Sequence, residues 1–165
     1  MGESILNNKC ILAVDDEPDV LDILEEEILM AAPSCKLDKA TTYKDALTML
    51  ETRNYDLVIL DIMGVNGFDL LNLALKRNYQ VVMLTAHALN PECLRRSYEK
   101  GARGYLPKEK LGEIISFLED IFREPDFLSG WRHILQKLEE YFNSKWGENW
   151  QQKAGHFWRD FYQKK

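Results

Sequence analysis

Five polar side chains of the sequence follow four apolar runs, at the positions where the runs end. They are Asp15 and Asp16 after ILAV, Asp61 after LVIL, Thr85 after VVML, and Lys108 two residues after GYL. If the runs are parallel strands, their carboxyl ends lie along one edge of a sheet and bring these side chains together. Three crowded carboxylates repel one another, and a hard divalent cation that takes oxygen ligands, Mg²⁺ above all, would relieve that repulsion.

This combination of groups predicts phosphoryl transfer. Once a cation and the Lys108 ammonium have drawn in the phosphoryl oxygens, the Asp61 carboxylate can attack phosphorus and become an acyl phosphate. Each residue also has a simpler explanation: the aspartates can cap the helices that follow them, Thr85 can be a turn hydroxyl, and Lys108 can be a solvated amine. The order and the strand-end placement of all five residues together favour the functional interpretation.

The apolar runs that carry these residues alternate with stretches of helical periodicity. The runs are CILAV, CKLDKA, LVIL, VVMLT and GYL, and each is followed by a segment such as PDVLDILEEEILMAA or FDLLNLALKR. Strands that are continuously apolar are buried on both faces, as in a parallel sheet covered by helices. We therefore predict a doubly wound α/β domain of five strands over residues 1–124, with the second strand at the sheet edge because it holds Asp38 and Lys39.

Residues 125–165 differ in composition from residues 1–124. They carry five acidic and seven basic residues, a net charge of +2, whereas the preceding part carries 22 acidic and 14 basic residues, a net charge of −8. All four tryptophans, and ten aromatic residues in total, lie in this C-terminal extension. Helical periodicity interrupted at Gly147 predicts two helices, whose aromatic side chains must pack against the rest of the chain, a second copy or a partner protein.

Several function classes are disfavoured by the sequence. The C-terminal extension has neither the helix-turn-helix pattern nor the charge of a DNA-binding domain, and His133 is expected to be a partly exposed helical histidine. No apolar run approaches the roughly 20 residues that span a bilayer, and the N-terminus lacks a secretory signal, so we expect a cytoplasmic protein without a membrane partner. The three widely spaced cysteines suggest neither a disulfide framework nor a zinc site.

The sequence resembles the receiver domain of two-component response regulators over about residues 8–123. The resemblance is carried by four motifs, VDD at 14–16, LDIM at 60–63, LTA at 84–86 and GYLPK at 104–108. This family has the flavodoxin-like fold of the chemotaxis regulator. The resemblance therefore implies a parallel sheet with strand order 2-1-3-4-5.

The resemblance also implies which residues hold the phosphoryl group and the metal. Asp61 would be the phosphoacceptor. Asp15, Asp16 and Asp61 would bind Mg²⁺ together with the backbone carbonyl of Met63. Phosphorylation would then add charge and strong hydrogen-bond acceptors at one point of the domain.

Three further residues would respond to the phosphoryl group by the same resemblance. Thr85 and Lys108 would each bind a phosphoryl oxygen, and Tyr105 would turn inward when Thr85 moves. Phosphorylation would thereby shift the domain between two conformations. His87, which also follows the fourth strand, is expected to be a surface histidine.

Two loops depart from the family pattern. The chain reads DIMGVNG over 61–67, which is shorter than usual and lacks the customary proline, and this bears on how the Met63 carbonyl meets a metal. Family members usually have a proline after the lysine, often with a cis peptide bond. Here Pro107 precedes Lys108 and Glu109 follows it, so another feature must direct the Lys108 side chain toward the site.

Three functions are compatible with these residues. The first is a single-domain response regulator, not an enzyme, that accepts a phosphoryl group on Asp61 from a sensor histidine kinase or phosphotransfer protein and signals to a downstream protein by contact. The second is a pseudo-receiver that is never phosphorylated and serves as an adaptor through its C-terminal helices, which could also form a homodimer. The third is a phosphohydrolase, which is disfavoured because Met63 stands where a general acid carboxylate is needed.

Overall fold

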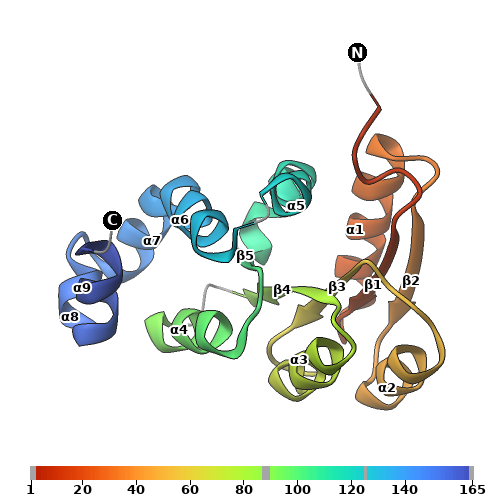
Figure 1. The fold of residues 1–165 in the computed structure, drawn as a ribbon, viewed down its shortest axis with the longest axis horizontal. Coiled ribbons are helices and arrows are strands. Elements are labelled where there is room, and N and C mark those ends of the chain that lie inside the picture. The colour runs from red at the N-terminus through yellow and green to blue at the C-terminus, as the bar shows by residue number, and fades with distance from the viewer. Residues whose placement is uncertain (1–2, 87–89, 125, 164–165) are drawn as a thin grey trace.

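A parallel sheet carries the motif residues at the ends of its strands. The computed structural model describes residues 3–86, 90–124 and 126–163, and within them five strands form one sheet in the order β2-β1-β3-β4-β5. The strands are β1 (Cys10–Val14), β2 (Lys36–Ala40), β3 (Leu57–Asp61), β4 (Gln80–Thr85) and β5 (Gly104–Pro107). Each described pairing is parallel, which confirms the predicted fold class and strand order (Figure 1).

Strand β2 lies at the edge of the sheet, as its charged residues predicted. The Asp38 carboxylate pairs with the Arg53 guanidinium at 2.8 Å and accepts a hydrogen bond from the Tyr55 hydroxyl at 2.7 Å. The Lys39 ammonium lies 3.1 Å from a Glu25 carboxylate oxygen on the neighbouring helix. Asp38 and Lys39 are thus paired at the rim, while β1 and β3 run through the buried centre of the sheet.

Helices cover both faces of the sheet. Figure 1 shows α1 (Pro18–Ala31) and α5 (Ile114–Arg123) on one face of the sheet, and α2 (Tyr43–Thr52), α3 (Gly67–Lys76) and α4 (Pro91–Lys100) on the other. Their buried positions, such as Leu21, Leu24 and Ile28 on α1, recur at helical spacing and face the sheet.

Two helices begin, and one of them ends, at residue types that commonly cap helices. The Thr42 hydroxyl accepts a hydrogen bond from the Asp45 amide at 3.1 Å, and the Asn90 side chain accepts one from the Cys93 amide at 2.9 Å. Gly101 ends α4 in the left-handed region, with φ of +101°. These local signals set where α2 and α4 begin and end.

The C-terminal extension folds as a chain of short helices. Within residues 126–163 these are α6 (Phe127–Lys137), α7 (Glu139–Trp146), α8 (Trp150–Lys153) and α9 (His156–Gln163). The prediction of two helices is wrong, because each expected helix is divided. The first division falls at Leu138, which is 2% exposed, and the second at Gly155, whose φ of +104° ends the helical path.

The extension packs against the α/β part of its own chain. The Trp131 indole donates a hydrogen bond to the carbonyl of Ala102, two residues before β5, at 2.8 Å. The ring of Tyr98 on α4 contacts four aromatic rings of the extension, those of Phe127, Trp131, Phe157 and Phe161. Figure 1 accordingly shows α6 beside α5 and the later helices beyond β5. The division of the chain at residue 124 into two domains stays a prediction.

Among the described residues, no helix has the length and apolar character that crossing a membrane requires.

Candidate functional site

Two aspartates end neighbouring strands at the carboxyl edge of the sheet. Asp61 is the last residue of β3 and is 4% exposed, and Asp15 follows β1 directly and is fully buried. The Asp15 amide donates to the Ala40 carbonyl of β2 at 3.1 Å, and one Asp15 carboxylate oxygen accepts from the Glu17 amide at 2.9 Å. Backbone hydrogen bonds therefore fix the position of Asp15 beside the end of β3.

Asp16 joins these two residues in a cluster of carboxylates. Asp15, Asp16 and Asp61 each offer an oxygen, and the three oxygens lie within 4.8 Å of one another. Burial raises the pKa of Asp61 to about 7, repulsion from Asp15 adds to this, and Lys108 opposes it. Burial also raises the pKa of Asp15. Oxygen ligands alone, crowded and partly buried, fit a hard divalent cation such as Mg²⁺.

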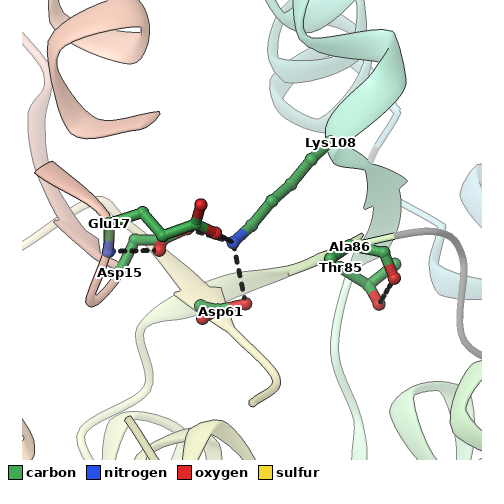
Figure 2. Close-up of polar contacts among 6 residues, drawn as sticks. All are labelled: Asp15, Glu17, Asp61, Thr85, Ala86 and Lys108. Carbon is green, nitrogen blue, oxygen red and sulfur yellow. Dashed lines mark hydrogen bonds and ion pairs between the residues drawn. The ribbon is translucent and has the colours of Figure 1, made fainter. Parts of the chain in front are cut away.

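Lys108 extends its side chain into the carboxylate cluster. Its ammonium lies 2.8 Å from an Asp15 oxygen, 2.8 Å from a Glu17 oxygen and 3.3 Å from an Asp61 oxygen, as Figure 2 shows. Burial alone would lower the pKa of Lys108, but the hydrogen bonds to Asp15 and Glu17 outweigh burial and raise it. The ammonium therefore stays charged and offsets part of the negative charge of the site.

The position of Lys108 differs slightly from the one that its sequence suggested. Strand β5 includes Pro107, so Lys108 follows the strand directly and not after a gap. Pro107 is the register partner of Thr85 on β4, and each peptide bond among the described residues is trans. The pairing of β5 with β4 and the three carboxylate contacts together fix the direction of the Lys108 side chain.

Thr85 and Tyr105 lie on neighbouring strands beside the cluster. Thr85 ends β4, is 1% exposed, and donates its hydroxyl proton to the Ala86 carbonyl at 3.3 Å, away from Asp61 (Figure 2). Tyr105 is fully buried, and burial raises the pKa of its hydroxyl, while an interaction with the Thr85 side chain lowers it. His87, the other candidate after this strand, lies outside the described residues.

The short loop after Asp61 brings its backbone close to Asp16. Gly64 has a φ of +86°, and a Cβ atom placed there would lie 2.5 Å from an Asp16 carboxylate oxygen. A Cβ atom at Gly67 would overlap the carbonyl oxygen of Asp61 itself. The loop is therefore compact only because glycine stands at both positions. The Met63 side chain is 64% exposed, and the role of its carbonyl as a ligand stays a prediction.

Glu17 is a contact of the site that sequence reasoning missed. Its carboxylate lies 2.8 Å from the Lys108 ammonium, although the two residues are 91 positions apart. The available signal was the third acidic residue in VDDEP, which directly follows the pair at 15–16.

His133 lies on α6 with 48% of its side chain exposed, as expected of a partly exposed helical histidine. Its ring is 3.7 Å from Asp120.

Comparison with known proteins agrees with this fold. The family model of the response regulator receiver domain matches residues 11–119. The two-component response regulator ARR18 of Arabidopsis thaliana is 36% identical over 133 residues, which are 77% of this chain and 18% of that protein. The chain thus spans less than a fifth of the length of this relative.

Solved structures agree in fold. A LuxR-family DNA-binding response regulator from Staphylococcus aureus superposes with a TM-score of 0.62 at 19% identity, over 68% of this chain and 98% of its own. A CheY-like receiver domain protein from Methanospirillum hungatei gives a TM-score of 0.50 at 24% identity, over 89% of this chain and 98% of its own. From the match to the family model, the chain belongs to the response regulator receiver domain family of two-component signalling.

Proposed function

We propose that this receiver accepts a phosphoryl group on Asp61 from a sensor histidine kinase or phosphotransfer protein and passes the signal on by protein contact. One observation carries the proposal: the Asp61 carboxylate stands 3.3 Å from the Lys108 ammonium, at the edge where Asp15 and Asp16 gather. Receiver domains are signalling modules and not classical enzymes. The cytoplasmic location, the absence of DNA binding and a homodimer through the C-terminal helices stay predictions.

The transfer step can be written for the residues present. An Asp61 oxygen attacks the phosphorus of a phosphohistidine, an oxygen–phosphorus bond forms, and the phosphorus–nitrogen bond breaks. The donor imidazole keeps the electron pair and takes up a proton. Lys108 offsets charge on one phosphoryl oxygen, and the Thr85 hydroxyl, once turned from the Ala86 carbonyl, donates to another.

Mg²⁺ is the cofactor that the carboxylate cluster fits best. Asp15, Asp16 and Asp61, with the Met63 carbonyl, would hold it. When bound, the ion supplies positive charge that compensates the carboxylates and the phosphoryl oxygens. The Asp15 and Asp61 carboxylates, which are buried beside each other, need such compensation because Lys108 brings only one positive charge.

Replacing Gly64 with Ala is expected to weaken Mg²⁺ binding, on the order of tenfold, a size typical of disturbed metal surroundings. The added Cβ would lie 2.5 Å from the Asp16 oxygen and push that ligand away. Isothermal titration calorimetry with Mg²⁺ measures the change. Gly147→Ala is the matched control, because Gly147 also has a positive φ, +94°, but nothing lies within 4 Å of its added Cβ. Equal Mg²⁺ affinity of the two variants would contradict the role of Asp16.

The proposed function is tested by phosphorylation of the intact chain. Incubation with acetyl phosphate and Mg²⁺, followed by intact-mass spectrometry, is expected to show one phosphoryl adduct that is lost when EDTA replaces Mg²⁺. Treatment with hydroxylamine should release the group, because acyl phosphates react with this nucleophile. No adduct under any of these conditions would contradict the proposal and favour the alternative, a pseudo-receiver that acts as an adaptor through its C-terminal helices.

A further inference from the structure

The C-terminal extension covers the face of the receiver formed by α4, β5 and α5. On the α4 side, Tyr98 packs against Trp131 with ring centroids 5.5 Å apart and against Phe161 at 5.3 Å. On the α5 side, the Lys137 ammonium pairs with Asp120 and donates to the Ser116 hydroxyl at 2.8 Å. This face is therefore occupied by a segment of the same chain.

The core of this contact includes Tyr105, the residue beside Thr85. The rings of Tyr105 and Phe142 on α7 have centroids 6.1 Å apart, and both side chains are fully buried. The Tyr105 hydroxyl interacts with Thr85 at the other end of the side chain. Tyr105 thus lies between Thr85 at the end of β4, whose hydroxyl would bind a phosphoryl oxygen, and the extension.

A second contact joins the same helix to the segment that follows β5. The Tyr141 hydroxyl donates to Glu109 at 2.7 Å, and the Lys145 ammonium lies 3.4 Å from the other Glu109 oxygen. Glu109 is the residue next to Lys108 in the chain. Any shift of the backbone that carries Lys108 therefore reaches α7 directly.

Beyond Phe142 the aromatic contacts continue through the extension. The Phe142 ring stacks on Trp146 with centroids 4.6 Å apart and an interplanar angle of 3°. Trp146 contacts Trp150 at 5.1 Å, and Trp150 contacts Trp158 at 5.3 Å. A movement of Phe142 must change the surroundings of these tryptophans, because the rings pack directly on one another.

We infer that α7 is the first helix of the extension to respond when the receiver is phosphorylated. Its contacts at Phe142 and Tyr141 link the phosphorylation site to the extension. The inference rests on the proposed function. A phosphoryl group on Asp61 would draw Lys108 away from Glu17 and Thr85 away from the Ala86 carbonyl. The first movement would shift the neighbouring residue Glu109, and the second would shift Tyr105. The first partner for the α4, β5 and α5 face is thus the chain's own extension.

The experiment compares Phe142→Leu with a matched control, Phe161→Leu. Both phenylalanines are buried in the extension, but Phe161 packs on Tyr98 and not, among the described contacts, on Tyr105. Each protein, with the extension in place, is treated with acetyl phosphate and Mg²⁺. Intact mass reports the adduct. Tryptophan emission reports changes in the extension, since all four tryptophans lie in the extension, and hydrogen exchange over 139–153 reports changes in its backbone.

The expected result is an adduct on all three proteins with different responses of the extension. Wild type and Phe161→Leu should show a change in emission and exchange upon phosphorylation, and Phe142→Leu should lose it. If Phe142→Leu does not fold, Tyr141→Phe replaces it and is expected to reduce the change, because it lacks the hydrogen bond to Glu109. An adduct on wild type with no change in the extension would overturn the inference alone. No adduct on wild type would overturn the proposed function and the inference with it.

Discussion

The Asp61→Asn variant is expected to form no phosphoryl adduct with acetyl phosphate and Mg²⁺. In the proposed reaction the nucleophile is a carboxylate oxygen of Asp61, and the amide that replaces it has almost the same shape but little nucleophilicity. Asp15 does not substitute for it, because one of its oxygens is held by the Glu17 amide and another by Lys108. Intact-mass spectrometry of the variant beside the wild type measures the loss.

The control for this prediction is an aspartate outside the site. Asp69 is an exposed residue of α3 that contacts the Tyr43 hydroxyl, and Asp69→Asn should retain the full adduct. Circular dichroism should show that Asp61→Asn keeps the fold, since the side chain volume is conserved at a position that is 4% exposed. A persistent adduct on Asp61→Asn would mean that another residue accepts the phosphoryl group and would refute the assignment.

The same residue is expected to dominate the pH dependence of stability in the metal-free protein. Burial raises the pKa of Asp61 from 3.8 to about 7, so between these values the unfolded chain ionises the carboxyl group while the native protein keeps it protonated. The unfolded state then binds fewer protons than the native state, and the free energy of unfolding falls as the pH rises from about 4 to about 7. The raised pKa of Asp15 acts in the same direction.

The size of this effect follows from the difference between the two pKa values. It corresponds to about 4 kcal/mol as an upper value, since one pKa unit is worth about 1.4 kcal/mol. Urea denaturation of wild type and Asp61→Asn in EDTA, from pH 4 to pH 8, isolates the contribution of this one residue. The variant should become the more stable protein as the pH rises, and added Mg²⁺ should reduce the difference. Parallel stability curves for the two proteins would show that Asp61 is not the titrating group.

The sheet and most of the strand-end residues were predictable from the sequence because their signals are local. Continuously apolar runs indicate strands buried on both faces, and a polar residue directly after such a run must lie at the sheet edge. Asp61 and Thr85 are therefore found at the predicted strand ends. The charged residues of the second strand likewise predicted, from the local sequence alone, that this strand lies at the edge of the sheet.

The contacts that were not predicted depend on long-range packing. Glu17 reaches Lys108 across the edge of the sheet, and sequence spacing carries no information on such a contact. The division between α6 and α7 falls at Leu138, an apolar residue that breaks no helix by itself. On either side of it, Trp131 of α6 packs on Tyr98 of α4 and Phe142 of α7 packs on Tyr105 of β5. An aromatic stripe predicts that a helix is buried but not which surface buries it.

The tryptophan rings of the extension also affect how the protein absorbs polarised light. Trp146, Trp150 and Trp158 lie at centroid distances of 5.1 Å and 5.3 Å with their planes inclined at 73° and 67°, so their indole transitions are coupled as excitons. Such coupling adds a pair of bands of opposite sign to the ultraviolet dichroism, on top of the helical signal. A helix content calculated from that spectrum would be distorted, while the bands themselves give a label-free signature of the packed extension.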